Sequence, residues 1–452
     1  MRHIVVIGAG LSGTLLMINL FRQNSSVPIR ISWIDRNDEK EMGPAYSTNE
    51  DYLLNVPVEM MGAYSENPAH FLQWCGEKKV PARNGDYMPR KLYRNYIQEA
   101  LKEARHGKEH QVQVERIRDE AIDLIPGETK LKVCLGNSRD VVADQVVLAL
   151  GNSLPSNPAL QDNEYIQSRH YIRNPWDPQL LDRFHQEEDL FFIGSGQTMT
   201  DLVNGLYMRN HRGRLTAISR RGILPMEQKK ADHYPSYYGE IRGRSDILSI
   251  FQVVHHHLRD AEKLGIDPRA VIDSLRPHTI DIWMSLPPEE KRRFLRHLFR
   301  YWEIIRSRIP PENGEIIRKS IESGQLRILK GRITRIDAGK DPMEIEYLDR
   351  ETKKMRKEKA HYLINCKGPN LDYDTIETGL IKNLIAKKII QCDQAHLGIN
   401  ALPGGAVLEP GGRPSNRLYT IGPTLKGIVW ESIATPEIRV LAENLARELL
   451  RA

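Results

Sequence analysis

Two glycine-rich segments contain the residues best suited to bind phosphate groups. In the first, Gly8, Gly10 and Gly13 follow the apolar run 3–7 and precede a helical pattern. Gly8 would allow a tight turn, Gly10 would let a pyrophosphate approach the backbone, and Gly13 would let the helix pack closely on the strand. The free N–H groups at the start of that helix would face the phosphates. Strand, glycines and helix in this order predict a dinucleotide site.

An acidic residue lies where the ribose of that dinucleotide is expected. The second strand pattern, 29–34, ends at Asp35, about 20 residues after the glycines, as the motif requires. A carboxylate there would accept a hydrogen bond from a ribose hydroxyl. This first motif alone does not distinguish FAD from NAD.

The second glycine-rich segment is an incomplete copy of the first. Gly194 and Gly196 follow the buried-strand run 190–193 and precede another helical pattern, but Met199 occupies the position of the third glycine. We expect the helix to pack less closely on its strand there, because methionine brings a side chain where the motif has none.

Two arginines end the next strand pattern, 215–219. Arg220 and Arg221 occupy the position at which an NAD site carries an acid. A guanidinium group binds phosphate through paired hydrogen bonds, so these residues predict NADPH rather than NADH. The alternative is a pair of solvated arginines at the end of a strand.

Two further apolar strands each end at a glycine. Residues 144–150 lead into Gly151, and residues 361–367 lead into Gly368. Such strands resemble the points at which two-domain flavoproteins pass between their FAD and NAD(P) domains, and this assigns the first motif to FAD. The alternative is two ordinary buried strands.

The predicted fold is therefore α/β, with two Rossmann-like dinucleotide-binding domains and the second inserted in the first. We expect the FAD domain to comprise residues 1–155 and 325–452, and the NADPH domain residues 156–324. Within the latter, 246–310 has helical periodicity, and a helix is expected to begin at Pro288. Its basic side chains indicate either a solvated face or the wall of an anion-binding cleft; they are Lys291, Arg292, Arg293, Arg296 and Arg300.

Composition excludes several classes of protein. The 452 residues carry a net charge of +6 spread along the chain, which favours small anionic partners over nucleic acid. The four cysteines form no CxxC pair, which argues against a zinc site and a disulfide reductase. The histidines 255–257 are adjacent on a predicted helix and cannot converge on one ion, so no metal is predicted. With no long apolar run and no signal-like N-terminus, we expect no membrane contact and a cytoplasmic location.

Motifs along nearly the whole chain are similar to one family. Besides the two glycine segments they are 43–47 with 53–57, 89–90 with Tyr93, 174–177, 219–222, 294–298 with Trp302, and 421–423 with 430–431 and 436–439. Together they resemble the bacterial FAD-NAD(P)-binding family and, more loosely, the flavin monooxygenases with two dinucleotide domains. The resemblance implies hydroxylase activity and specifies no substrate.

Four other residues are candidates for cofactor contacts. Asn55 would hydrogen-bond the flavin or a substrate, or else cap its own loop. Arg90 would bind the cofactor pyrophosphate in preference to pairing with an acid. Gly422 opens a closing segment that in related flavoproteins reaches the flavin, although Pro423 replaces the usual acid. Trp430 would stack near the flavin or pack in the core.

Three functions follow as hypotheses. The first is an NADPH-dependent flavin monooxygenase that hydroxylates a small polar or anionic molecule. The second is a flavin dehydrogenase or reductase with an organic or protein acceptor. The third, suggested by Met199, is a non-catalytic FAD-binding protein. No Ser/His/Asp or Cys/His arrangement identifies a catalytic side chain, so the flavin itself would carry the redox chemistry. The sequence specifies neither the substrate nor the oligomeric state.

Overall fold

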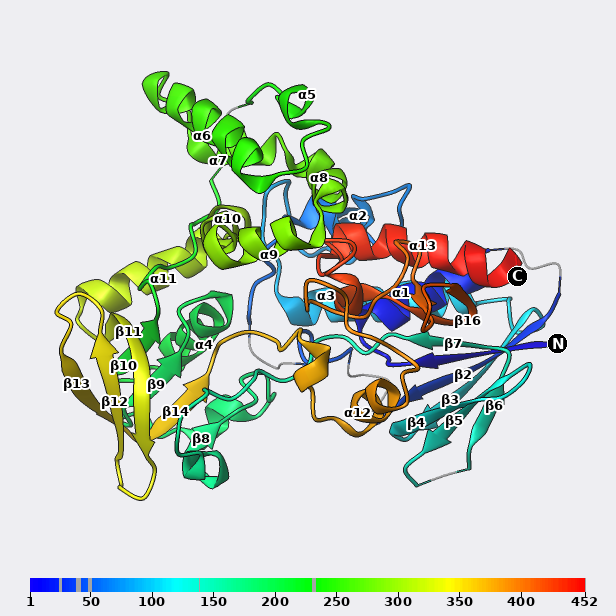
Figure 1. Cartoon of the computed structure of the whole chain (residues 1–452), viewed down its shortest axis with the longest axis horizontal. Helices are drawn as coiled ribbons and strands as arrows, with labels where there is room; N and C mark the ends of the chain where they lie inside the picture. Colours follow the sequence, from blue (N-terminus) through cyan, green and yellow to red (C-terminus); the bar gives the residue numbers. More distant parts are fainter. Residues whose placement is uncertain (24–26, 38–41, 48–50, 138, 230–232, 452) are drawn as a thin grey trace.

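Two β-sheets, each with helices on its faces, lie side by side in the computed structural model, and a group of helices projects from their junction (Figure 1). The structure describes residues 1–451 except 24–26, 38–41, 48–50, 138 and 230–232. The predicted class, α/β with two Rossmann-like units, is confirmed.

The first sheet has the strand order β15-β16-β7-β1-β2-β3, parallel except at β15. Its strands are β1 (Arg2–Ile7), β2 (Ile29–Asp35), β3 (Val112–Arg118), β7 (Gln145–Leu148), β15 (Ala406–Leu408) and β16 (Pro414–Thr420). Alternation along β1 decides what covers each face, because successive side chains point to opposite sides. Ile4 and Val6 face the helices, whereas Val5 and Ile7 face the other layer.

Different layers cover the two faces of this sheet. On one side lie α1 (Leu11–Arg22), α2 (His70–Glu77), α3 (Arg90–Arg105) and α13 (Thr435–Arg451). On the other side lie the small antiparallel sheet of β4 (Ala121–Pro126), β5 (Leu131–Leu135) and β6 (Val141–Ala143), together with α12 (Gly379–Ala386).

The second sheet has the order β13-β12-β11-β10-β9-β14-β8. Its strands are β8 (Tyr171–Ile172), β9 (Leu190–Ile193), β10 (Leu215–Ser219), β11 (Leu326–Asp337), β12 (Met343–Asp349), β13 (Met355–Ala360) and β14 (Tyr362–Asn365). The helices α4 (Gln197–Met208) and α11 (Pro311–Glu322) cover one face. The domain boundary expected at residue 325 does not coincide with the change of sheet. β11 pairs in parallel with β10, and β14 pairs with β9, so the chain leaves this sheet only after Asn365.

The two segments that connect the sheets run together, as the strands ending at Gly151 and Gly368 suggested. The chain passes from β7 to β8 after Gly151 and from β14 to α12 after Gly368, and both glycines have positive φ, 66° and 85°. The Asn370 backbone N–H donates to the Leu154 carbonyl at 3.4 Å. Both connections between the two domains therefore lie in one place.

The helices between the two halves of the second sheet form a separate packed group. They are α5 (Tyr238–Ile241), α6 (Ile247–Lys263), α7 (Pro268–Asp273), α8 (Thr279–Ser285), α9 (Pro288–His297) and α10 (Phe299–Arg306). Pro288 begins α9 as expected, but the helix ends before Leu298, and α10 starts anew at Phe299. None of the helices in the described ranges is long and apolar enough to cross a membrane.

Candidate cofactor and active site

The first glycine loop is held by contacts that leave no room for side chains. Gly8 has φ +110°, and a Cβ there would lie 2.2 Å from the Ala149 carbonyl oxygen. A Cβ on Gly13 would lie 2.1 Å from the Gly8 oxygen. The packing predicted for these two glycines is confirmed. Gly10 caps α1 without a side-chain hydrogen bond, and the first turn of α1 carries no acid. The positive end of this helix is thus available to a phosphate.

Asp35 lies directly beside this loop. Its Oδ2 accepts a hydrogen bond from the Ala9 backbone N–H at 2.6 Å, and its Oδ1 accepts one from the Asn37 N–H at 2.9 Å. A carboxylate at the end of β2 and next to the glycine loop is where a ribose hydroxyl would be bound.

Replacing Asp35 with alanine is expected to weaken FAD binding. A hydrogen bond to a charged group contributes about 1.5–3 kcal/mol, or roughly a ten- to hundredfold change in Kd. Asp35→Asn, which keeps an acceptor oxygen, should lose less. The Kd is measured by flavin fluorescence on re-addition of FAD to apoprotein. The control is Asp140→Ala, which removes an exposed carboxylate just before β6. An unchanged Kd in Asp35→Ala would place the ribose elsewhere.

The second glycine loop repeats the geometry of the first. Gly194 has φ +118°, and a Cβ there would lie 2.4 Å from the Cys366 carbonyl oxygen. Gly196 caps α4 in extended geometry without a side-chain bond, and the first turn of α4 is again free of acids. Met199 is fully buried in the core beneath α4. Its side chain is accommodated, so the missing third glycine does not disrupt this unit.

The turn that follows β10 is fastened to this second loop. The Ser195 hydroxyl donates to the Ile223 carbonyl at 2.7 Å and contacts the Ser219 hydroxyl at 2.9 Å. Ser219 Oγ also accepts from the Gly222 N–H at 3.0 Å. The two arginines of this turn are therefore held beside the loop, as the motif requires.

The two arginines differ in their surroundings. Arg220 is exposed, and none of the described acids pairs with it. Arg221 places its guanidinium 4.3 Å from the centre of the Tyr301 ring on α10. Lys367 was not predicted from the sequence, although it lies near Arg220: burial first, and then the Arg220 charge, lower its pKa. The Lys367 ammonium itself donates to the carbonyl and the hydroxyl of Ser156, both at 3.0 Å, on the segment that connects β7 to β8.

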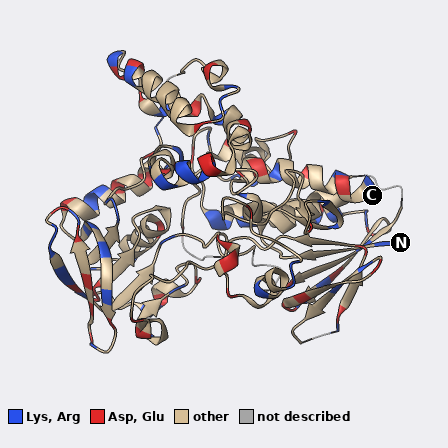
Figure 2. Ribbon diagram, viewed as in Figure 1, with Lys and Arg blue, Asp and Glu red and all other residues tan. Residues whose placement is uncertain are grey.

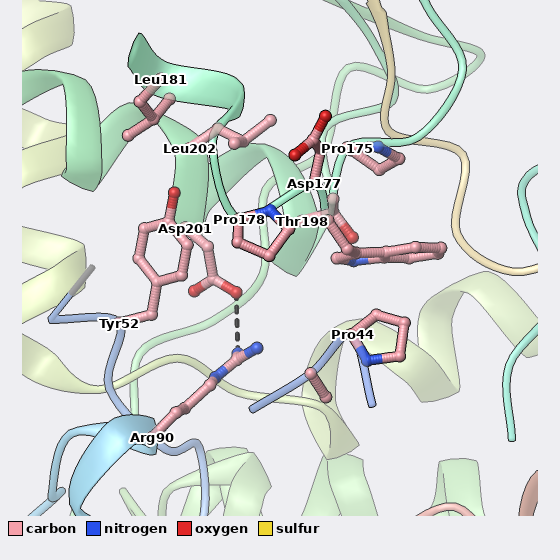
Figure 3. Close-up of a pocket in the computed structure, with 12 residues that line it drawn as sticks. Pro44, Tyr52, Arg90, Pro175, Asp177, Pro178, Leu181, Thr198, Asp201 and Leu202 are labelled. Carbon is pink, nitrogen blue, oxygen red and sulfur yellow. Dashed lines mark hydrogen bonds and ion pairs between the residues drawn. The ribbon is translucent and has the colours of Figure 1, made fainter. Parts of the chain in front are cut away.

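Arg90 occupies the junction of the two domains rather than a free anion site. Its Nη2 donates to Asp201 Oδ2 on α4 at 2.7 Å, as the dashed line in Figure 3 shows. The side chains of Arg90 and Asp201 are only 18% and 14% exposed. Burial raises the pKa of Asp201, and the Arg90 charge opposes that rise. The acid pairing that was the alternative for Arg90 is thus present, and the pyrophosphate contact stays a prediction.

Asn55 also bridges the domains. Its Nδ2 donates to Gln197 Oε1 at 3.2 Å, and Gln197 Nε2 donates to the Arg308 carbonyl at 2.9 Å. Gln197 is the first residue of α4, so Asn55 stands at the second glycine loop. Side chains from both domains surround a small cavity of about 20 Å³ beside this junction, among them Tyr52 and Asp177 (Figure 3).

The closing segment abuts the first glycine loop. Gly422 has φ +86°, and a Cβ there would lie 2.2 Å from the Ser12 hydroxyl in the first turn of α1. The buried hydroxyls of Thr420 and Thr424 bond each other at 2.6 Å, and Thr420 donates to the Leu148 carbonyl. This rigid turn would border whatever binds at the N-terminus of α1.

Trp430 is a core residue, which was the alternative to stacking on the flavin. It is 6% exposed, and its ring lies 4.3 Å from the Trp283 ring and 5.7 Å from the Phe299 ring, centre to centre. Trp283 Nε1 also donates to the Gly427 carbonyl at 2.9 Å. These contacts join the helical group to the closing segment.

Charged side chains line the same junction. Arg306 on α10 donates twice to Glu431, at 3.2 and 3.0 Å, and this pair is largely buried. Lys426 stands 5.3 Å from the Trp430 ring centre, and burial lowers its pKa. Burial also raises the pKa of Glu437. The cations of α9 and α10 are conspicuous in Figure 2, but several pair with acids of their own helices, such as Arg293 with Glu290 and Arg300 with Glu303.

The two loops fit the cofactors that the sequence predicted. Both present an uncapped helix N-terminus, a glycine with positive φ and a first turn without acids, which is what a pyrophosphate needs. An adenosine ribose would lie at Asp35 in one and an adenosine phosphate at Arg220 in the other.

Two family models match the chain. Residues 5–153 match the FAD-NAD(P)-binding model, and residues 80–233 match the model described as L-lysine 6-monooxygenase/L-ornithine 5-monooxygenase. No protein in the curated collection matches. The predicted pairing of FAD with a nicotinamide nucleotide is thereby confirmed.

Solved structures share the fold over the full length. The ornithine N-hydroxylase of Kutzneria sp. 744 is 14% identical, with TM-score 0.68, covering 100% of this chain and 99% of its own. The L-lysine 6-monooxygenase of Pseudomonas syringae is 13% identical, with TM-score 0.67, covering 100% and 99%. The cadaverine monooxygenase of Erwinia amylovora is 14% identical, with TM-score 0.66, covering 99% and 94%. Each family model covers less than half of the chain, so the chain is similar to these two families over part of its length, and it shares the two-dinucleotide-domain fold of the flavin-dependent monooxygenases over all of it.

Proposed function

We propose that this protein is an NADPH-dependent FAD monooxygenase that hydroxylates a small polar molecule carrying a primary amine. The observation that carries the proposal is the match of residues 80–233 to the lysine and ornithine monooxygenase model. That range includes the last part of the first FAD-domain segment, the segment that connects β7 to β8, and the whole second glycine loop. Bound FAD, once reduced by NADPH, would activate oxygen. The use of NADPH is consistent with the expected cytoplasmic location.

The side chains of the chain would act by binding and positioning. The first glycine loop and Asp35 would hold FAD, and the turn 420–425 would border it. Gly194, Gly196 and Arg220 would hold NADPH. The Arg90–Asp201 and Asn55–Gln197 contacts would keep α4, and with it the nicotinamide nucleotide, at a constant position relative to the FAD domain. Such positioning is a major source of rate enhancement in transfer between two bound partners.

The proposal of a primary-amine substrate rests on the similar solved structures and on the charged side chains of this chain. The similar structures are named for ornithine, lysine and cadaverine, which all carry primary amines. In this chain the junction of the helical group and the closing segment contains Glu431 and Glu437, and the pKa shift of Glu437 reflects burial. Because Arg306 and Glu431 already pair with each other, Glu437 is the carboxylate that suits a cationic group, and Lys426 is the cation that suits the carboxylate of an amino acid.

Cysteine chemistry does not support the disulfide-reductase alternative. All four cysteines are free, and burial raises the pKa of Cys75 to about 11 and that of Cys392 to about 12. Such thiols remain protonated at neutral pH and are poor nucleophiles.

The decisive experiment follows oxygen uptake by the FAD-loaded protein with NADPH and a panel of ornithine, lysine, cadaverine and related amines. We expect one or more of these amines to accelerate oxygen uptake and to gain one oxygen atom, detected by mass spectrometry. Anaerobic turnover with an artificial acceptor at the aerobic rate, with no amine-dependent oxygen uptake, would instead identify a dehydrogenase or reductase. Absence of flavin bleaching by NADPH would identify a non-catalytic protein.

A further inference from the structure

Four side chains of three chemical types converge where the chain returns from the second sheet to the first. They are Asp372, Asp374, Cys392 and His396, and their ligand atoms all lie within 4.8 Å of one another. His396 Nδ1 is 3.2 Å from Asp372 Oδ1 and 3.4 Å from Asp374 Oδ2, and Cys392 Sγ is 4.0 Å from Asp372 Oδ1. This cluster is remote from both glycine loops in the chain and plays no part in the proposed reaction.

Two of these separations are close to the edges of a tetrahedron around zinc, whereas the widest separations in the set, up to 4.8 Å, would have to shorten on binding. With metal–N and metal–O bonds of about 2.0–2.1 Å, tetrahedral geometry puts ligand atoms about 3.3 Å apart, and a sulfur ligand at about 2.3 Å lies about 3.5 Å from an oxygen ligand. The two N–O separations agree with this edge. The S–O separation would shorten by about half an ångström on binding, which a cysteine rotamer can supply.

The charge of the cluster is not balanced by basic side chains. In the part of the chain that the structure describes, the ion pairs of Asp372 and Asp374 go only to His396, and no lysine or arginine pairs with either carboxylate. Two carboxylates, a thiol and an imidazole therefore face one another with one weak base between them. A divalent cation would neutralise both carboxylates and convert the thiol to a thiolate.

The backbone holds the four ligands in place without a metal. Asp372 and Asp374 flank Tyr373, whose ring is buried in the core at the start of η5 (Tyr373–Thr375). Cys392 pairs with Ile399 across a short hairpin. The buried carboxylate of Asp393 accepts N–H bonds from Ala395 and Leu397, each at 2.7 Å, and so shapes the turn that presents His396.

His396 itself has an unusual backbone conformation. Its φ is +56°, in the left-handed region that non-glycine residues seldom adopt. The conformation directs the imidazole toward Asp372 and Asp374. Residues kept in such conformations cluster at ligand sites.

We propose that Asp372, Asp374, Cys392 and His396 bind one Zn²⁺ in a structural site. Nitrogen, sulfur and oxygen ligands in fourfold arrangement suit zinc, whereas magnesium and calcium prefer oxygen ligands alone. The metal would tie the crossing segment that follows Gly368 to the hairpin 392–399. That hairpin also contacts the helical group, since Arg292 Nη1 donates to the Gln394 carbonyl at 3.1 Å.

The test uses the FAD-loaded full chain, treated with a chelator, desalted and titrated with ZnCl₂. We expect one zinc ion per chain by metal analysis after dialysis. Cys392→Ala and His396→Asn should each weaken zinc binding at least about tenfold, because even loss of a residue that only orients a ligand costs that much. Asparagine is chosen at 396 because it tolerates positive φ. Cobalt in place of zinc should give the absorption of a tetrahedral thiolate site, at wavelengths beyond those of the flavin.

Two matched substitutions serve as controls. Cys134→Ala removes a cysteine of the small sheet, and His256→Ala removes an exposed histidine of the 255–257 triplet on α6; neither should change zinc binding. FAD content and the circular dichroism spectrum show that each variant is folded. The proposal is overturned if the unaltered chain retains no zinc, or if its affinity survives either Cys392→Ala or His396→Asn.

Discussion

Replacing Arg90 with methionine is expected to lower the free energy of unfolding by about 3–5 kcal/mol, the cost of leaving a buried charge without its partner. Asp201 is 14% exposed and has Arg90 as its ion-pair partner. Methionine preserves most of the apolar packing of the arginine stem, so the loss reports on the charge. The measurement is denaturant unfolding of the FAD-loaded protein, with nucleotide affinity as a second readout.

The pH dependence of this effect has a definite sign. Burial raises the pKa of Asp201, and removing Arg90 removes the contact that opposes the rise. When the pKa of a carboxyl group is higher in the folded protein than in the unfolded chain, the free energy of unfolding falls as the pH rises above the unfolded pKa of about 3.9. The Arg90→Met penalty should therefore be largest at neutral pH and should shrink as the solution is acidified.

Two variants distinguish the loss of the buried Arg90–Asp201 ion pair from the loss of any positive charge. Lys91→Met removes the neighbouring cation, whose partner Asp51 is 64% exposed, and should cost no more than about 1 kcal/mol. Arg90→Met combined with Asp201→Leu should recover most of the lost stability, because no unpaired charge remains. Equal losses in Arg90→Met and Lys91→Met would contradict the assigned role of the pair.

The second large effect concerns the choice of nucleotide. The unaltered protein should reach half-maximal flavin reduction at roughly ten- to hundredfold lower NADPH than NADH, the equivalent of one hydrogen bond to a charged group. Arg220→Ala should abolish most of this preference by weakening NADPH alone. Arg221→Ala should have a smaller effect, because its guanidinium is engaged with Tyr301. The rates are followed by anaerobic bleaching of the flavin.

A distant exposed arginine provides the control for this experiment. Arg212→Ala removes the same charge from the same domain, where it pairs with Glu187, and should leave the preference intact. Equal half-saturating concentrations of NADPH and NADH in the unaltered protein would refute the assignment. A preference that survives the double Arg220→Ala and Arg221→Ala substitution would place the phosphate at another cation, with Lys367 tested first.

Local patterns allowed the main features of the fold to be predicted. Glycine spacing, strand runs and Asp35 are all short-range signals, and each lies in the predicted element. The packing of Gly8 and Gly13 could be anticipated because the motif itself specifies a turn and a close helix.

Contacts between distant residues could not be predicted in the same way. Arg90 and Asp201 are separated by 111 positions, and nothing near Arg90 indicates which acid it meets. The packing of Trp430 against Trp283 is likewise a contact between residues far apart in the chain. The alternating pattern of β11 likewise predicts a strand but does not specify its neighbour, so the boundary expected at 325 fell inside the second sheet.

The sequence carries only a weak signal of the candidate metal cluster. Asp372 and Asp374 are separated by one residue, and Cys392 and His396 by three. Patterns of paired cysteines or of adjacent histidines do not include ligand sets of mixed type, so neither pattern indicates this cluster. The two pairs come together only because the segment that follows Gly368 passes the hairpin 392–399.

The side-by-side course of the two crossing segments has a consequence for how this chain is assembled. Because Leu154 and Asn370 are hydrogen-bonded neighbours, the chain leaves the FAD domain and returns to it at nearly the same point. The nicotinamide domain is therefore an insertion at a single site of the FAD domain. A host domain tolerates such an insertion because the distance between its own cut ends is unchanged. The strands β7 and β16 are adjacent in the first sheet although 265 residues, 149–413, separate the end of β7 at Leu148 from the start of β16 at Pro414. A short linker joining 153 to 371 would close the same gap in the backbone, although excision of the nicotinamide unit would also remove the buried partners of Arg90 and Trp430.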